Sequence, residues 1–315
     1  MKSMHRVLVT GGAGFIGSKL IPLLLDANNS VTIFDNLSSG KMENLSKVRA
    51  HPNFKFIQGD IRDPQSLSDA LQYVDAVIHL AAVIDVSASV VDPISTNEIN
   101  VVGTLNVLQA AKNKGVKKLV FASSTAVYGD TKALPVKEDT ILKPISPYAA
   151  SKAAGEAYCS AYANCYDLET VALRFFNVYG PRNENSPYSG VITKFLRKAV
   201  NNEPLTIEGD GKQTRDFIHV SDIARAIMAA LESSRLRGEV FNVCTGFPTS
   251  VNQLAETIKE VTRRKLQVMH NSPRIGDIRN SYGDSTNATR QLGFRANVTL
   301  SNGLEMLFNE LQINN

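Results

Sequence analysis

The sequence has few cysteines, and their spacing does not indicate a disulfide framework. Its three cysteines, Cys159, Cys165 and Cys244, form no Cys-x-x-Cys pair and have no metal-ligand spacing. Scattered thiols of this kind are typical of small, reduced core residues. We therefore expect neither a disulfide nor a bound metal.

Long apolar segments are missing as well. No apolar run approaches the ~18 residues that a membrane-spanning helix requires, which argues against a membrane protein. Near its start the chain reaches the apolar run Val7–Val9, followed at once by Thr10 and a glycine pair. This start leaves no room for a signal peptide, so we expect a soluble protein in the cytoplasm.

Charge of one sign is nowhere concentrated. The 315 residues include 34 Lys and Arg and 30 Asp and Glu, for a net charge of +4, and the basic residues form no block. Nucleic-acid binding is therefore not indicated, although a few arginines remain for small anionic ligands. The hydrophobic share of 43% is that of an ordinary globular protein with one large or two closely associated domains.

Short β-branched segments alternate with longer amphipathic ones in the first two-thirds of the chain. We predict strands at Arg6–Thr10, Ser30–Phe34, Phe54–Gln58, Val74–Leu80, Lys118–Ser123 and Glu169–Arg174, and helices at Gly14–Leu25, Pro64–Gln72, Asp92–Lys114 and Pro147–Tyr166. Continuously apolar strands with helices between them are typical of a parallel sheet covered on both faces. The pattern predicts a doubly wound α/β fold. Pro22 lies well inside the first predicted helix, where a proline ring costs a backbone hydrogen bond and usually produces a kink.

The second part of the chain has a different rhythm. After about Asn177, polar stretches rich in glycine and proline separate shorter predicted helices, at Gly190–Val200, Ser221–Glu232, Ser250–Val261 and Ser301–Leu311. We expect Val240–Val243 to be a strand that returns to the main sheet. The first domain then comprises residues 1–177 with a return segment near 215–245, and a smaller, partly discontinuous α/β domain for substrate binding comprises residues 178–214 and 246–315.

A glycine-rich segment follows the first predicted strand and opens the first helix. Gly11, Gly12, Gly14 and Gly17 satisfy both G-x-x-G-x-x-G and G-x-G-x-x-G. Glycines there permit a tight turn and bring backbone N–H groups close to a pyrophosphate, which the positive end of the helix attracts. A tight turn without a ligand would need the same glycines, so the spacing by itself is weak evidence.

Asp35 strengthens the case for a dinucleotide. It lies 18 residues after Gly17, at the end of the second predicted strand, where a carboxylate suits the ribose hydroxyls. A carboxylate also repels a 2′-phosphate, and no arginine follows it closely. The residues therefore favour NAD over NADP, bound to a Rossmann-type sheet.

From this point the sequence resembles a known family over nearly its whole length. The segments Thr10–Gly17, Asp35–Gly40, Gly59–Arg62 and His79–Ala82 stand in the order and wording of the extended short-chain dehydrogenases/reductases that modify nucleotide sugars with NAD. The resemblance implies that NAD contacts Gly11, Gly14, Phe15, Ile16, Gly17, Asp35, Asn36, Ser38, Ser39, Gly40, Asp60, Ile61, Leu80, Ala81, Ala82, Asn100, Tyr148, Lys152 and Phe176.

Tyr148 and Lys152 are the candidate catalytic pair. They are four residues apart in a predicted helix and share a face, as many surface pairs do. Ser123 and Ser124 end the preceding strand, and carboxyl ends of parallel strands border the ligand crevice. A nearby ammonium would lower the phenol pKa from its ordinary value of ~10. The resemblance implies Tyr148 as base and acid, Lys152 on the nicotinamide ribose, and Ser124 on the reacting hydroxyl.

The residues after Ser124 distinguish among the reactions of this family. Ser124–Gly129 contains no acidic residue, whereas the dehydratases carry an acidic pair there and the decarboxylases an acid nearby. The sequence of this segment resembles that of the 4-epimerases. These enzymes oxidise carbon 4, let the keto sugar turn over and return the hydride to the opposite face. We predict a UDP-hexose 4-epimerase. A hexuronate 4-epimerase, a reductase and a non-catalytic dinucleotide sensor remain alternatives.

The resemblance also implies a substrate site and a homodimer. The residues implied to bind substrate are Ser124, Tyr148, Asn177, Arg215, Arg274 and Ser281. The two arginines would grip the diphosphate. Ser281 stands where side-chain size limits the sugar pocket, so we expect UDP-N-acetylhexosamines to enter as well. The two subunits would pack through Asp92–Lys114 and Pro147–Tyr166.

Two departures from the family pattern concern single positions. Ile84 replaces a lysine of many galactose epimerases, so one cofactor contact is missing or replaced. Glu208 replaces an aromatic residue that packs near the nucleotide base. Uridine therefore remains an expectation.

Overall fold

The computed structural model describes residues 5–181, 190–273 and 278–313, and its centre is a seven-stranded parallel sheet. In sheet order the strands are β11 (Glu239–Val243), β6 (Glu169–Phe175), β5 (Lys118–Ser124), β4 (Ala76–His79), β1 (Arg6–Thr10), β2 (Ser30–Asp35) and β3 (Phe54–Gln58). The chain winds outward in both directions from β1. The predicted doubly wound α/β fold is confirmed, and its switch point lies between β1 and β4.

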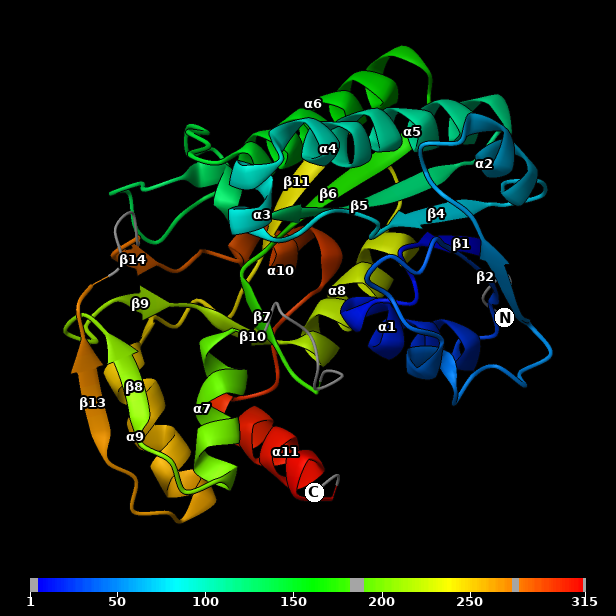
Figure 1. Ribbon diagram of the computed structural model, residues 1–315. Helices are drawn as coiled ribbons and strands as arrows, with labels where there is room; N and C mark the ends of the chain where they lie inside the picture. Colours follow the sequence, from blue (N-terminus) through cyan, green and yellow to red (C-terminus); the bar gives the residue numbers. More distant parts are fainter. Residues whose placement is uncertain (1–4, 182–189, 274–277, 314–315) are drawn as a thin grey trace.

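Helices cover both faces of this sheet (Figure 1). One layer contains α2 (Pro64–Ala70), α3 (Val86–Val91), α4 (Pro93–Asn97), α5 (Gly103–Asn113) and α6 (Pro147–Cys165), and the other contains α1 (Phe15–Asp26) and α8 (Val220–Glu232). Because both faces are covered, the strands are apolar along most of their length. β4, for example, is buried at every position.

Of two predicted helices, the first is present as expected and the second differs in detail. α1 continues through Pro22, because Leu20, Ile21 and Leu24 on its buried face keep the helix packed on the sheet despite the missing proline N–H. The helix expected over Asp92–Lys114 is interrupted by the π-helical turn η2 (Glu98–Val102), which lies between α4 and α5. Such single π-helical turns are frequent at functional sites.

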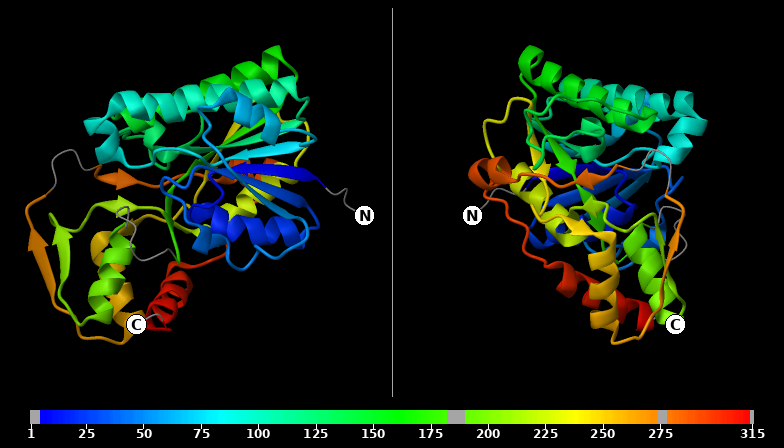
Figure 2. Two further views of the ribbon diagram at one scale, coloured as in Figure 1. Left: turned by 45° about the vertical axis from the view of Figure 1, so that its right-hand side comes forward. Right: turned by 90° about the vertical axis from the view of Figure 1, so that its left-hand side faces the viewer.

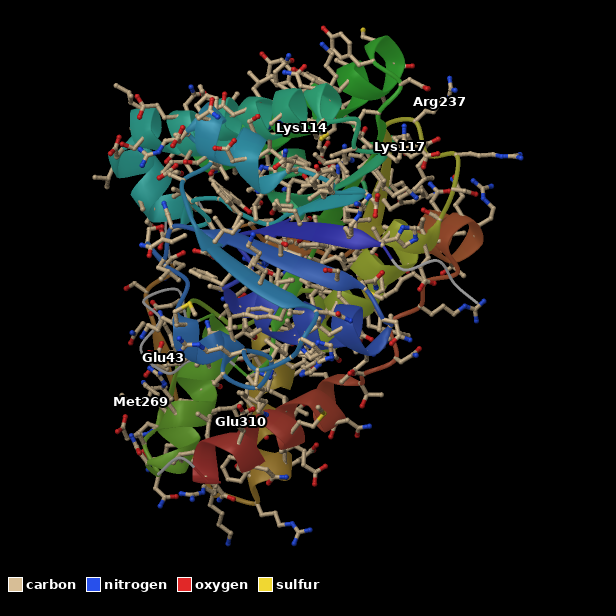
Figure 3. All side chains as sticks on the ribbon, turned by 90° about the vertical axis from the view of Figure 1, so that its right-hand side faces the viewer. Glu43, Lys114, Lys117, Arg237, Met269 and Glu310 are labelled. Carbon is tan, nitrogen blue, oxygen red and sulfur yellow. The ribbon has the colours of Figure 1, made fainter. Side chains whose placement is uncertain are left out.

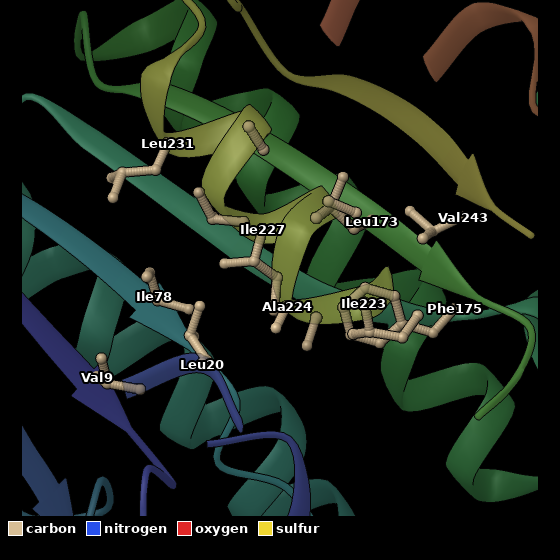
Figure 4. Close-up of a cluster of buried hydrophobic side chains, with 14 of the residues drawn as sticks. Val9, Leu20, Ile78, Leu173, Phe175, Ile223, Ala224, Ile227, Leu231 and Val243 are labelled. Carbon is tan, nitrogen blue, oxygen red and sulfur yellow. The ribbon is translucent and has the colours of Figure 1, made fainter. Parts of the chain in front are cut away.

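The core beneath the switch point is shown in Figure 4. Three side chains of the sheet pack against Ile223 and Ile227 of α8: Val9 of β1, Ile78 of β4 and Leu173 of β6. All five are fully buried. This packing fixes the distance between the strands and the helices α1 and α8. The carboxyl ends of β1, β4 and β5 therefore form one continuous edge.

A second, smaller part of the chain follows β6 and has its own core. Its elements are β7 (Asn177–Tyr179), α7 (Val191–Val200), β8 (Leu205–Glu208), β9 (Thr214–Arg215), β10 (Phe217–His219), β12 (Thr249–Ser250), α9 (Val251–Thr262), β13 (Val268–Asn271), β14 (Asn280–Ser281) and α11 (Leu300–Ile313). α10 (Thr286–Leu292) lies in the same stretch of sequence but packs against β11 and α8, and its Ala288 belongs to the main core. Phe195, Leu254 and Leu304 are buried together there. α7, α9 and α11 lie together to one side of the sheet (Figure 2).

The chain crosses between the two parts more than once. Only Phe176 separates the end of β6 from the start of β7, and β11 later pairs with β6 in parallel, so the strand expected at Val240–Val243 does return to the main sheet. The exact domain limits stay a prediction. The crossing places the second part at the carboxyl ends of the strands.

The surface carries scattered charge. In Figure 3 the labelled charged side chains Glu43, Lys114, Lys117, Arg237 and Glu310 lie at the outside of both parts of the molecule. None of the helices within the described ranges combines the length and apolar character needed to cross a bilayer.

The three cysteines do not all lie in the core. Cys159 and Cys244 are buried, but Cys165 is exposed, so the expected core position is wrong for this last residue. It ends α6, where the helix leaves the sheet.

Candidate active site

The glycine-rich turn between β1 and α1 packs directly against the segment that follows β4. Gly11 has a φ of +68°, and a Cβ atom there would lie 2.6 Å from the Ala81 nitrogen and 2.9 Å from the Leu80 carbonyl carbon. A Cβ on Gly17 would collide with the carbonyl oxygen of Gly12. The turn is therefore a backbone cradle at the start of α1, which a side chain would fill and which suits a pyrophosphate.

Asp35 holds the next loop over this turn. Its carboxylate accepts the backbone N–H of Ala13 at 2.9 Å and that of Leu37 at 2.8 Å. Burial raises the pKa of Asp35, and these two hydrogen bonds lower it. Ser38 and Ser39 are exposed on this loop, whereas Gly40 is buried against Ala13 and Asp35. The loop and the glycine turn therefore form one surface.

The residues predicted to lie by the adenine are adjacent to that loop. Asn36 donates to the Asp60 carboxylate at 2.9 Å, and Arg62 pairs with the same carboxylate at 2.8 Å. The guanidinium holds the pKa of Asp60 well below its usual range. Ile61 is buried beside them. The expected adenine side is thus assembled from the ends of β2 and β3.

Tyr148 and Lys152 face the carboxyl end of β5 from α6. The Tyr148 phenol lies beside Ser124, whose side chain lowers its pKa, and the Lys152 ammonium donates to the Ala122 carbonyl at 2.9 Å. The same ammonium lies 5.0 Å from the centroid of the Phe121 ring. The structure therefore brings the three predicted catalytic residues together at one strand end.

The electrostatics of this pair are governed by burial. Burial raises the pKa of the Tyr148 phenol and the Ser124 side chain lowers it, against our expectation of a value lowered by Lys152. The physical reason is that desolvation disfavours the phenolate more than the surrounding groups stabilise it. Burial also lowers the pKa of Lys152 to about 8, while the Glu156 carboxylate raises it. With a pKa of about 8, Lys152 still carries its positive charge at neutral pH.

A chain of hydrogen bonds joins Tyr148 to the glycine turn. The Asn100 side chain, in the π-helical turn, accepts the Val83 N–H at 2.7 Å and donates to the Val83 carbonyl and the Ser151 hydroxyl, both at 2.9 Å. Ser151 donates in turn to the Tyr148 carbonyl at 2.8 Å. Val83 follows Leu80–Ala82, which packs on Gly11. The predicted cofactor residues and the predicted catalytic residues therefore line one continuous site.

His79 forms the floor beneath this chain. Its ring nitrogens lie 2.6 Å from the Thr10 hydroxyl and 2.9 Å from that of Thr104, which donates to the Asn100 carbonyl at 2.6 Å. Burial lowers the pKa of His79 to about 3. This neutral histidine ties β1 and β4 to the π-helical turn, and it is not placed to act as an acid or base.

A buried ion pair supports α6 one turn beyond Lys152. Glu156 binds Arg174 through two contacts of 2.9 and 2.7 Å and also accepts from Ser123. Arg174 donates to the Tyr128 hydroxyl at 2.7 Å, and that hydroxyl donates to Asn242 at 2.6 Å. A buried pair that lost one partner would leave an uncompensated charge, so the network holds α6, β5 and β6 in one arrangement.

The predicted substrate residues approach from the second part of the molecule. Arg215 in β9 and Ser281 in β14 are paired neighbours, and Asn177 donates to the carbonyl of Asp216, the residue after Arg215, at 3.3 Å. Arg215 donates to the Thr214 and Ile278 carbonyls at 2.8 and 2.7 Å. Arg274 lies outside the described residues.

Phe176 connects the two sides of the site. It is buried, its N–H bonds the Val243 carbonyl at 3.2 Å, and a Cβ on Gly283 would meet its ring. Ile84, at the departure from the family pattern, is 45% exposed. Within the described ranges, no group of three or more His, Cys, Asp or Glu is placed to hold a metal ion.

Sequence reasoning missed the supporting residues Ser151, Glu156 and Asp216. Glu156 lies four residues after Lys152, a spacing that places both on one helix face and could have marked the position. Ser151 and Asp216 have no such local signal, because their partners are distant in sequence.

The chain matches a protein family and is similar to known proteins. A sequence model described as the NAD dependent epimerase/dehydratase family matches residues 7–244. UDP-glucose 4-epimerase of Mycolicibacterium smegmatis is 40% identical over 301 residues, or 95% of this chain and 96% of that protein.

Two solved structures are similar over almost the whole chain. UDP-N-acetylglucosamine 4-epimerase from Methanobrevibacter ruminantium, in complex with UDP-N-acetylmuramic acid, has a TM-score of 0.94 and 41% identity, and the match covers 99% of this chain and 100% of that one. UDP-glucose 4-epimerase from Thermotoga maritima with UDP-glucose has a TM-score of 0.92 and 37% identity, with coverage of 98% and 99%.

Replacing Gly17 with alanine tests the cradle. The added Cβ would push the Gly12 carbonyl out of place, so we expect Gly17→Ala to weaken NAD binding by about a hundredfold or more. Calorimetric titration with NAD measures the change. Gly190→Ala is the control, because a Cβ there meets nothing within 4 Å. Equal affinities for the two variants would contradict the cradle.

Proposed function

The chain belongs to the NAD-dependent epimerase/dehydratase family, and we propose that it is a 4-epimerase of UDP-linked hexoses that interconverts UDP-glucose and UDP-galactose. The observation that carries the proposal is the convergence of Tyr148, Ser124 and the buried Lys152 at the carboxyl end of β5. This arrangement suits proton transfer to and from a secondary alcohol that Ser124 holds. The relatives described above are named as UDP-sugar 4-epimerases. Their names support uridine as the nucleotide of the substrate and carbon 4 as the sugar carbon that reacts.

The protein's own residues would act as follows. NAD, when bound, supplies the hydride acceptor and donor at carbon 4. Ser124 orients the sugar hydroxyl, and Tyr148 removes its proton and returns it after the sugar has turned over. Because burial raises the Tyr148 pKa, the phenolate needs the positive charge of Lys152 close by. The buried Asn100–Ser151 link holds Tyr148 at a fixed distance from the cofactor loop.

Two acids of the described residues are held in structural bonds, which favours epimerisation over elimination or decarboxylation. Glu156, which accepts from Ser123, is bound to Arg174, and Glu138 accepts from the Asn242 N–H at 2.9 Å and from Asn287 at 3.0 Å. Both acids are thus committed to structural bonds. A dehydratase needs a free acid and a free base that act at a second carbon of the sugar. Glu156 and Glu138 do not supply them.

Replacing Tyr148 with phenylalanine separates this enzyme from a dinucleotide sensor. We expect Tyr148→Phe to lower kcat by about a hundredfold or more, because proton transfer is lost, while NAD binding stays intact. The assay supplies UDP-glucose without added NADH and follows UDP-galactose by chromatography. Turnover that requires external NADH would indicate a net reductase, and turnover only with UDP-glucuronate a hexuronate epimerase.

We propose that acetylated sugars also enter the site. Ser281 is a small, partly buried side chain beside Arg215 at the edge of the substrate side. A serine there leaves space that a bulky residue would fill.

A panel of UDP-sugars tests this specificity. We expect turnover of UDP-N-acetylglucosamine by the unchanged protein, and we expect Ser281→Tyr to lower kcat/KM for that sugar about tenfold more than for UDP-glucose, because the ring would occupy the acetyl space. Strict rejection of acetylated sugars by the unchanged protein would overturn the proposal. Ser281→Thr is the control for a smaller change in size.

We further propose a homodimer that acts in the cytoplasm. Large apolar side chains are exposed on the layer formed by α3 to α6, including Val91 at 86%, Ile94 at 73%, Val102, Tyr158 and Tyr166. Several large apolar side chains exposed on one layer of helices are typical of a subunit interface. The three free thiols, two of them buried, suit a reducing compartment.

A charge on this face should separate the subunits. We expect Ile94→Glu to convert the dimer to a monomer in light scattering coupled to size-exclusion chromatography, because the new carboxylate would be desolvated at the interface. Met269→Glu on β13 is the control, since Met269 is also exposed but lies in the second part. A monomeric unchanged protein would rule out the dimer.

A further inference from the structure

Asp216 is a buried carboxylate that bonds two loops at once. It lies between β9 and β10 and is 0% exposed. One carboxylate oxygen accepts the Thr245 N–H at 2.9 Å and the Thr245 hydroxyl at 2.6 Å. The other accepts the Gly246 N–H at 2.8 Å and the Gly283 N–H at 3.4 Å. Four donors therefore converge on a single side chain.

The segments that meet at Asp216 also carry the predicted substrate residues. Arg215 precedes Asp216 in the chain, and Ser281 lies two residues before Gly283 and pairs with Arg215. The backbone and side-chain N–H groups of Asn177 donate to the Asp216 carbonyl at 3.0 and 3.3 Å. One residue thus connects β7, β9 and β14 through both its carboxylate and its carbonyl.

The Gly283 contact extends this connection to the cofactor side. Gly283 is buried against Phe176 and Cys244, since a Cβ there would lie 2.8 Å from a Phe176 ring carbon and 2.9 Å from the Cys244 sulfur. Phe176 is one of the residues predicted to contact NAD. The strand that carries Ser281 is therefore held at a fixed distance from the cofactor side of the site.

A carboxylate is the group that this environment requires. Its oxygens only accept hydrogen bonds, and all four neighbours are donors. Asparagine would place an NH₂ group against two of these donors and leave them without an acceptor. Without these donors, burial of the Asp216 carboxylate would cost folding free energy. Without the carboxylate, the Thr245–Gly246 turn and the Gly283 segment would lose the acceptor that holds them together.

We propose that Asp216 is a positioning residue that sets the width of the sugar pocket by clamping the Thr245–Gly246 turn and the Ser281–Gly283 segment to β9. The inference rests on the proposed function and deepens it, because β9 and the Ser281–Gly283 segment carry Arg215 and Ser281, which would border the diphosphate and the sugar. Asp216 acts through Arg215 and Ser281 and does not itself meet the substrate.

The test compares Asp216→Asn with the matched control Asp222→Asn. Asp222 is also 0% exposed, and it accepts the N–H groups of Asn297 and Val298, both at 3.1 Å, which holds the segment before α11 to α8. We expect Asp216→Asn to raise KM for UDP-glucose about tenfold, with a smaller fall in kcat, because the pocket loses its fixed wall. NAD affinity should stay within about twofold for both variants.

The ratio of substrates gives a second readout. For Asp216→Asn we expect kcat/KM for UDP-N-acetylglucosamine, relative to UDP-glucose, to rise several-fold, because the segment with Ser281 is released. Asp222→Asn should lower the melting temperature without moving this ratio or KM. Equal shifts in the two variants, or an unchanged KM in Asp216→Asn, would overturn the clamp.

A milder pair keeps the test decisive if Asp216→Asn does not fold. Thr245→Val removes the hydroxyl donor and should raise KM in the same direction by a smaller factor, whereas Thr245→Ser retains it and should restore the original KM. Equal KM values for valine and serine at this position would contradict the proposal.

Calorimetric binding of UDP separates the clamp from the proposed function. If the unchanged protein binds UDP but epimerises no UDP-hexose, the proposed function fails, and weaker UDP binding by Asp216→Asn than by Asp222→Asn still supports the clamp. If the unchanged protein does not bind UDP, both are overturned.

Discussion

The close packing of α6 on β5 is the constraint on which the rest of the site depends. Gly155 allows this approach, because a Cβ there would collide with the Phe121 ring. At that distance the Lys152 ammonium reaches the Ala122 carbonyl, and Tyr148 reaches Ser124. A helix held even slightly higher would separate a phenol from its partner, and proton transfer is steeply sensitive to such displacement.

The buried polar groups around this helix are of two kinds, structural and reactive. Glu156 and Arg174 neutralise each other beneath α6, and His79 stays uncharged beneath the π-helical turn. Neither is available for acid–base chemistry, because each is enclosed by its own partners. The reactive protons therefore belong to Tyr148 and Lys152, whose pKa values are shifted mainly by desolvation.

The site has two sides that are stabilised in different ways. The cofactor side consists of strand ends and a backbone turn, whose positions follow from the parallel sheet. The substrate side consists of short strands and loops without a large sheet behind them, and a buried carboxylate substitutes for that support. Phe176 and Gly283 pack where the two sides meet.

The sequence by itself determined the sheet, the glycine turn with Asp35, and the Tyr148–Lys152 pair, because periodicity and short spacings are local properties of the chain. Only the tertiary structure decided the π-helical turn at Asn100, the exposure of Cys165, the raised pKa of Tyr148 and the contacts of Asp216. These depend on burial and on partners far away in the sequence, such as Ser151 for Asn100 and Gly283 for Asp216. Side chains that meet only after folding leave no periodic signal in the residues beside them.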